Sequence, residues 1–161
     1  MHCADEWTAA APAPMRHSSV MATSNQHRGV TVERTATGRF TILNARDGHI
    51  VIGTGDDASF TPTELLLAAI GGCTAIDVDI LTSRRSEPDT FDIRVDADTV
   101  RDDNGNRLTD IVVTFDVTFP DGEAGDAARA ALPESIARSH DRLCTVGRTV
   151  ELGTAIATRR L

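Results

Sequence analysis

The chain has 161 residues, which suits one domain with a core of its own. Its formal net charge is −8, because 24 acidic residues outnumber 16 arginines and there is no lysine. An acidic chain without a basic stripe is a poor candidate for binding nucleic acid or an anionic membrane surface. Aromatic residues make up only 4% of the chain, so the core must be built mainly from Val, Ile, Leu and Ala.

Residues 1–29 have the composition of a disordered tail. An Ala- and Pro-rich stretch is followed by Ser, His, Asn and Gln without an apolar period, and no structural role is expected for Cys3. Acidic residues stand where a secretory signal would have its basic region, and no apolar segment follows. We therefore expect a cytoplasmic protein with reduced thiols and one folded domain over residues 30–161.

A three-stranded antiparallel meander is predicted at the start of this domain. Apolar alternation from Val30, and an extended run over residues 40–43, predict two strands separated by a turn at Gly38. Asp47-Gly48 predicts a hairpin turn, because type I′ geometry needs positive φ at both central positions. Residues 49–52 then complete the meander.

A long helix is predicted next. Thr61 is a suitable N-cap, Pro62 suits the first helical position, and Glu64 completes a capping box. The helix is expected to run to about Arg85, before Pro88. Apolar or small residues surround its first three turns, which predicts burial on all sides. Its uncharged run of 12 residues is shorter than the roughly 20 that a membrane span needs, so we expect a core helix.

The second half of the domain predicts a hairpin, helices and a last strand. Apolar residues alternate with polar ones in two runs on either side of a turn, as expected for half-exposed strands. Pro133 should kink or split the helical region that follows. The expected ranges are strands over 91–98 and 111–119, helices over 124–140 and 144–152, and a terminal strand over Thr154–Thr158. This order indicates an α+β fold, with helices packed on antiparallel strands.

Two cysteines carry the strongest candidate chemistry. Cys73 lies within the predicted long helix, and Cys144 lies in the C-terminal part of the chain. A cysteine in a buried helix is usually an inert packing residue, but its thiolate is the strongest nucleophile available here. A metal site formed by Cys73, His140 and Cys144 would lack recognisable spacing and a fourth ligand. We therefore expect no metal or cofactor, and redox chemistry and inert packing remain the two alternatives.

The segment Phe60–Asp77 reads FTPTELLLAAIGGCTAID, and it lies between the predicted meander and the predicted hairpin. Together with the second cysteine, this arrangement resembles the OsmC/Ohr family of thiol peroxidases over residues 30–161. The resemblance is closer to the general OsmC-like branch than to the organic hydroperoxide resistance proteins. It implies an intertwined homodimer, with paired cysteine helices sandwiched between two sheets and with sites at the subunit interface.

The resemblance also implies a reaction. Cys73 matches the peroxidatic cysteine, which attacks an organic hydroperoxide, with hydrogen peroxide as a further candidate substrate, and becomes a sulfenic acid. Cys144 matches the resolving cysteine, which condenses with that sulfenic acid to a disulfide. An external dithiol then resets the site by exchange, and in characterised relatives this reductant is often a lipoylated protein. The implied biological role is antioxidant, in the response to oxidative stress.

The activating groups of the family match this chain only in part. The resemblance implies an arginine from the N-terminal strands, for which Arg39 is the best match and Arg34 the second. It also implies a glutamate at the position that Thr63 occupies here. The neighbouring Glu64 lies about 13 Å along a straight helix from Cys73 and on the opposite side. The capping box explains Glu64 without catalysis, so a catalytic and a capping role both stay open.

The second cysteine motif departs from the family as well. Thr145 follows Cys144 where the hydroperoxide resistance proteins have a proline. His140 is four residues before Cys144, so an imidazolium could lower the pKa of that thiol, although a solvated histidine at a helix end is the simpler interpretation. The leading hypothesis is a cysteine-based hydroperoxide reductase. The alternative is a non-enzymatic dimer that binds a small apolar ligand and uses both cysteines for packing.

Overall fold

The computed structural model describes residues 26–160. Cys3 and residues 1–25 of the predicted tail lie outside this range. The elements occur in the order β1 (Val30–Ala36), β2 (Arg39–Asn44), β3 (His49–Ile52), α1 (Pro62–Thr82), β4 (Thr90–Asp102), β5 (Gly105–Thr118), α2 (Glu123–Arg138), the π-helix η1 (Ser139–Leu143) and α3 (Thr145–Glu151). All strand pairs are antiparallel, which confirms the predicted α+β class.

The predicted meander is present as the sheet β1-β2-β3. Its second turn differs from the type I′ geometry expected for Asp47-Gly48, because Asp47 alone of the two has a positive φ, of 63°. The side chain of Asn44 closes this turn instead. Its Oδ1 accepts hydrogen bonds from the N–H groups of Arg46 and Gly48, at 2.8 and 3.1 Å.

Helix α1 begins as predicted. The Thr61 side chain accepts a hydrogen bond from the N–H of Glu64 at 3.2 Å, and the Glu64 carboxylate accepts one from the N–H of Thr61 at 2.7 Å. This reciprocal pair is the predicted capping box. The helix ends at Thr82, with Ser83 as its C-cap, slightly before the predicted end at Arg85.

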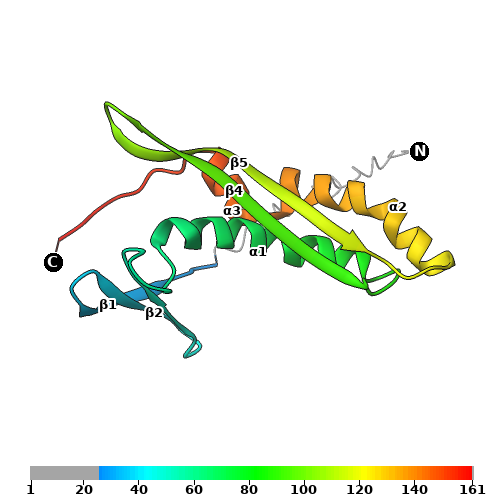
Figure 1. Ribbon diagram of the computed structural model, residues 1–161, viewed down its shortest axis with the longest axis horizontal. Coiled ribbons are helices and arrows are strands. Elements are labelled where there is room, and N and C mark those ends of the chain that lie inside the picture. Colours follow the sequence, from blue (N-terminus) through cyan, green and yellow to red (C-terminus); the bar gives the residue numbers. More distant parts are fainter. Residues whose placement is uncertain (1–25, 161) are drawn as a thin grey trace, which may run out of the picture.

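One side of α1 packs against β4, and another against α2, η1 and α3 (Figure 1). Gly71 allows the close approach to the hairpin, because a Cβ atom at this position would lie 2.7 Å from Cγ2 of Val95 on β4. The buried positions of the helix are Ile70, Gly71, Thr74, Val78 and Thr82. Through these positions α1 packs against the hairpin and against the segment that carries Cys144.

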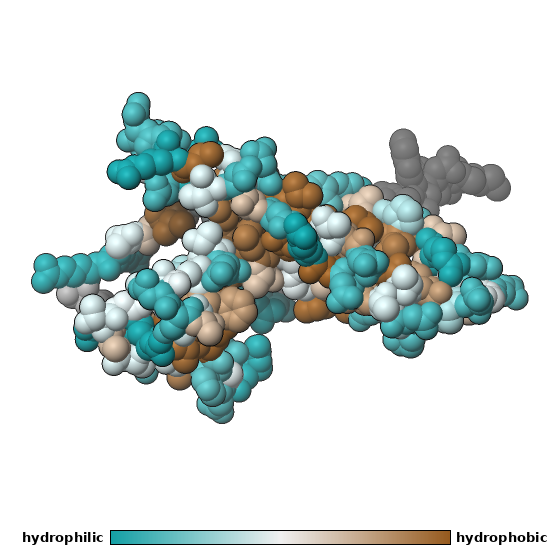
Figure 2. Space-filling view, in the orientation of Figure 1, coloured by the Kyte–Doolittle hydropathy of each residue, from teal (hydrophilic) through white to brown (hydrophobic). Residues whose placement is uncertain are grey.

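The predicted burial of α1 on all sides is wrong for the single chain. Within its first three turns Leu66 is 39% exposed, and the same face continues beyond them with Ile76 and Ile80 at 62% and 52%, because none of the described elements covers it. Large apolar patches are correspondingly visible on the surface of the molecule (Figure 2). By length and composition alone α1 could also cross a membrane, a test that core helices of soluble proteins pass too.

Strands β4 and β5 form a long two-stranded hairpin that crosses α1 and α2 (Figure 1). Its side chains alternate as predicted, with Ile93 opposite Phe115 and Val95 opposite Val113 on the face toward the helices. The hairpin and the helices thus form two layers, and the space between them is apolar.

Helix α2 runs through Pro133 without a break, so the predicted interruption at this residue is wrong. Proline removes one intrahelical hydrogen bond, which leaves the carbonyl of Arg129 without its helical partner. Both residues are exposed, so solvent can satisfy that carbonyl. The regular helix continues beyond Pro133 to Arg138, where the wider turn of η1 begins.

The predicted terminal strand over Thr154–Thr158 is also wrong for the described chain. After α3 the backbone is extended but pairs with no strand, and Ile156 is 94% exposed. A strand is stabilised by ladder hydrogen bonds to a neighbour, and none of the described strands lies alongside this segment.

Candidate functional site

The fold brings the two predicted cysteines together from distant parts of the sequence. Cys73 lies on α1 and is half-buried, whereas Cys144 follows η1 and is only 2% exposed. Cys144 is among the groups that act on the Cys73 thiol, so the two side chains are neighbours. Both are free thiols, so the site is a reduced dithiol.

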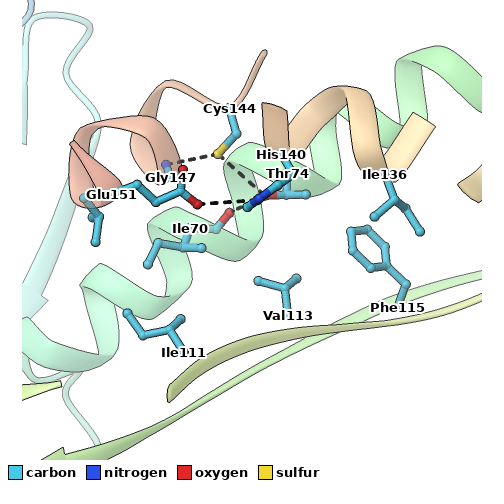
Figure 3. A pocket seen from close by; sticks show the side chains of 11 residues that line it. Ile70, Thr74, Ile111, Val113, Phe115, Ile136, His140, Cys144, Gly147 and Glu151 are labelled. Atoms are coloured by element: carbon cyan, nitrogen blue, oxygen red, sulfur yellow. Dashed lines mark hydrogen bonds and ion pairs between the residues drawn. The ribbon is translucent and has the colours of Figure 1, made fainter. Parts of the chain in front are cut away.

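Cys144 is held by its backbone and by its sulfur. Its N–H donates to the carbonyl of Ser139 at 2.9 Å. This hydrogen bond closes the wide turn of the π-helix. Its Sγ accepts from the N–H of Gly147 at 3.2 Å and lies 3.6 Å from the hydroxyl of Thr74, which also donates to the carbonyl of Ile70 (Figure 3). These contacts fix the sulfur against α1, next to Cys73.

Burial is the main cause that raises the pKa of the Cys73 thiol above its ordinary value of 9.0. The neighbouring Cys144 raises this pKa as well, through side-chain hydrogen bonding and through charge repulsion between the two sulfurs. The backbone N–H groups of Val146 and Thr145 act in the opposite direction and lower this pKa in part. Within one chain, therefore, the surroundings of Cys73 disfavour its thiolate.

The other predicted site residues have separate partners. Arg39 forms an ion pair with Asp57, and Glu64 is bound in the capping box. Arg34 donates a hydrogen bond to the Thr37 hydroxyl at 3.0 Å. None of these three is among the groups that shift the pKa of Cys73.

A cavity of about 360 Å³ lies beside Cys144, between α1, β5, α2 and α3 (Figure 3). His140 and Glu151 line it at one end, with His140 Nδ1 3.5 Å from Glu151 Oε1. The sulfur of Cys144 and the hydroxyl of Thr74 provide its other polar lining. The apolar lining consists of Ile70, Ile111, Val113, Phe115, Ile136 and Val150. An uncharged organic molecule of modest size would suit this space.

Sequence reasoning missed the residues that hold Cys144 in place. Thr74 was adjacent to a candidate residue, but its 3.6 Å approach to the Cys144 sulfur joins segments that no local pattern connects. Gly147 carried no signal beyond its place within the short last helix. Over residues 26–160, no three His, Cys, Asp or Glu side chains are grouped closely enough to bind a metal ion.

Comparisons with known proteins agree with this architecture. The family model described as OsmC-like protein matches residues 53–159. An uncharacterized protein of Mycobacterium tuberculosis (strain ATCC 25618 / H37Rv) is 32% identical over 127 residues, which cover 78% of this chain and 90% of that protein.

Solved structures show the same fold. An OsmC-like protein of unknown function from Vibrio cholerae aligns with a TM-score of 0.66 and 13% identity, over 79% of this chain and 95% of that one. A hypothetical protein from Aquifex aeolicus VF5 aligns with a TM-score of 0.64 and 23% identity, over 81% and 91% of the two chains. With the family match covering most of the described residues, the chain belongs to the OsmC-like protein family.

Proposed function

We propose that the protein is a thiol-dependent peroxidase that reduces organic hydroperoxides. The Cys73 thiolate attacks the O–O bond, so that the sulfur becomes a sulfenic acid and the leaving alkoxide takes a proton to become an alcohol. The Cys144 thiol then displaces water from that sulfenic acid and forms the Cys73–Cys144 disulfide. An external dithiol reduces this disulfide to two thiols and is itself oxidised to a disulfide.

The observation that carries this proposal is the contact between the two thiols. A sulfenic acid on Cys73 would form beside the Cys144 sulfur, which the hydrogen bond from Gly147 already orients. Two cysteines that served only for packing would not need to meet across the fold. Membership of the OsmC-like family favours the same role in peroxide or stress responses.

The cavity beside Cys144 supports an organic rather than an inorganic peroxide. Its lining is mostly aliphatic, so it would bind the alkyl group of a hydroperoxide by removing apolar surface from water. Hydrogen peroxide has no such group. We therefore expect cumene hydroperoxide to be consumed faster than hydrogen peroxide at equal concentration.

The groups of a single chain raise the pKa of Cys73, so they do not by themselves activate its thiol. A thiol becomes nucleophilic when a cation or additional donors stabilise its thiolate. We propose that a second copy of the chain supplies this stabilisation, with Arg39 as the candidate cation, exchanged from Asp57.

The exposed face of α1 favours a homodimer. Leu66, Ala69, Cys73, Ile76 and Ile80 follow one another at alternating spacings of three and four residues. This spacing places them along one seam of the kind that packs against another helix. Leu66, Ile76 and Ile80 are 39%, 62% and 52% exposed in the single chain.

The meander β1-β2-β3 also has little to pack against among the described elements of this chain. All seven residues of β1 are exposed, and neither α1 nor the β4–β5 hairpin packs extensively against this sheet. Two copies could cover both surfaces. Ile76→Arg should therefore give a monomer by light scattering, whereas Arg101→Ala, a change on the exposed hairpin, should leave the dimer intact.

Peroxide turnover tests the proposal. Reduced protein is mixed with cumene hydroperoxide and an excess of dihydrolipoamide, and peroxide loss is measured. Cys73→Ser should abolish turnover, while Cys3→Ser should leave it unchanged. Absence of turnover by the dimeric wild-type protein would refute the peroxidase proposal.

The cavity also favours a second candidate function, binding of a small apolar ligand without chemistry. Its volume and its aliphatic lining are the specific observations behind this alternative. Under it, a fluorescent apolar probe would bind equally well to the wild-type protein and to Cys73→Ser. Phe115→Asp would abolish binding, and no peroxide would be consumed by any form.

A further inference from the structure

We propose that Asp77 and Ser139 are positioning residues that set the effective concentration of the two thiols, through a hydrogen bond that ties η1 to α1. This inference rests on the proposed pairing of Cys73 with Cys144 in the reaction. It assigns a role to two residues that contact neither sulfur.

The bond joins the two cysteine-bearing segments directly. The Ser139 hydroxyl donates to Oδ2 of Asp77 at 2.9 Å. Asp77 lies one helical turn beyond Cys73 on α1, and Ser139 is the first residue of η1. The hydroxyl of Thr74 makes a second, longer side-chain contact between α1 and this segment, at 3.6 Å to the Cys144 sulfur.

The same serine also holds the backbone of Cys144. The Ser139 carbonyl accepts the N–H of Cys144 at 2.9 Å across the wide turn of η1. A chain of two hydrogen bonds therefore runs from Asp77 through Ser139 to the second cysteine. Single-turn π-helices occur often at functional sites, and here the wider turn sets the direction in which Cys144 leaves η1.

Burial strengthens this link. Ser139 is fully buried, and Asp77 is half-buried. A buried hydroxyl that loses its acceptor keeps its desolvation penalty, so the pair resists separation. The bond therefore limits the distances that the Cys144 sulfur can sample relative to Cys73. Such restriction raises the effective concentration of one group at another.

The chain offers matched controls for both residues. Ser135 is a buried serine one turn earlier on α2, and its hydroxyl donates locally to the carbonyl of Ala131 at 2.9 Å. Asp79 is a half-buried aspartate on α1 that accepts locally from Ser83 at 3.0 Å. Neither control bond reaches the Cys144 segment.

The test is the equilibrium between dithiol and disulfide in a glutathione redox buffer, measured by thiol trapping and mass spectrometry in a Cys3→Ser background. Ser139→Ala and Asp77→Ala should each lower the equilibrium constant for the intramolecular disulfide by roughly three- to tenfold. Ser135→Ala and Asp79→Ala should match the wild-type protein. Asp77→Asn keeps an acceptor oxygen and should restore most of the loss.

The double variant Ser139→Ala/Asp77→Ala should fall no further than either single variant, since both remove one bond. Equal constants for Ser139→Ala and Ser135→Ala would overturn the inference, as would additive losses in the double variant. Circular dichroism of every variant reports its folding, and where one of the two alanine variants unfolds the other still removes the bond and tests it. Peroxide turnover is measured separately, so loss of the proposed reaction with an intact effect on the disulfide would refute only the reaction.

Discussion

The hydroxyl of Thr74, the residue after Cys73 on α1, lies 3.6 Å from the sulfur of Cys144. This contact joins the middle of the chain to the start of the last helix. It places the second thiol over the same turn of α1 that carries the first.

Cys144→Ser should leave the first oxidation step intact and block its resolution. Cys73 would then remain a sulfenic acid, and further peroxide would convert it to sulfinic and sulfonic acids. Mass spectrometry of the Cys73 peptide after several equivalents of cumene hydroperoxide measures this. If the wild-type protein and the variant accumulated the same overoxidised species, Cys144 would have no resolving role.

Cys144→Ala should lower the pKa of Cys73. The substitution removes the side-chain hydrogen bonding and the charge repulsion that Cys144 contributes, and both raise that pKa in the native protein. Alkylation of Cys73 by iodoacetamide should therefore be faster in the variant at pH 8, with a pH midpoint below that of the wild-type protein. A midpoint above the wild-type value would contradict this description of the dithiol.

Thr145→Pro should have the opposite effect. It deletes one backbone N–H that stabilises the Cys73 thiolate, so the pKa of Cys73 should rise further and alkylation should slow several-fold. Proline suits the first position of α3, and the extended backbone of Cys144 is compatible with a following proline. Thr145→Ala keeps the N–H and is the matched control. Similar rates for the two variants would exclude a role for this donor.

Glu64→Gln should keep peroxide turnover close to the wild-type value, because glutamine can also complete a capping box. The Thr61 hydrogen bonds lower the pKa of Glu64 below its ordinary 4.5. Their contribution to stability is therefore present above pH 4.5 and is lost as the pH falls through the lowered pKa. The melting temperature of the variant should fall less between pH 7 and pH 3. A large loss of turnover would instead assign Glu64 a catalytic role.

Local signals predicted most elements of the fold. The Thr61 to Glu64 spacing gave the start of α1, and the alternation around Ile93 and Phe115 gave the hairpin. These features depend on neighbouring residues alone. The predicted interruption at Pro133 was wrong, because the energetic cost of a proline inside a helix depends on whether solvent reaches the freed carbonyl. The sequence does not give that exposure.

The candidate site was less predictable, because it depends on contacts between segments that lie far apart in the sequence. The residue types of Cys73 and Cys144 identified them as candidates, but their contact depends on how η1 packs on α1. The support from Ser139 requires a π-turn, for which no sequence pattern was available. The exposed face of α1 likewise reflects what a single chain leaves uncovered, whereas composition alone predicted complete burial.

The joint role of Cys73 and Cys144 is measured most directly by disulfide formation after one equivalent of peroxide. Fully reduced Cys3→Ser protein is mixed with one equivalent of cumene hydroperoxide, quenched with a thiol-blocking reagent and mapped by non-reducing peptide mass spectrometry. We expect an intramolecular Cys73–Cys144 disulfide in near-stoichiometric yield, with one equivalent of alcohol released. Two blocked, unoxidised thiols with the peroxide intact would contradict it.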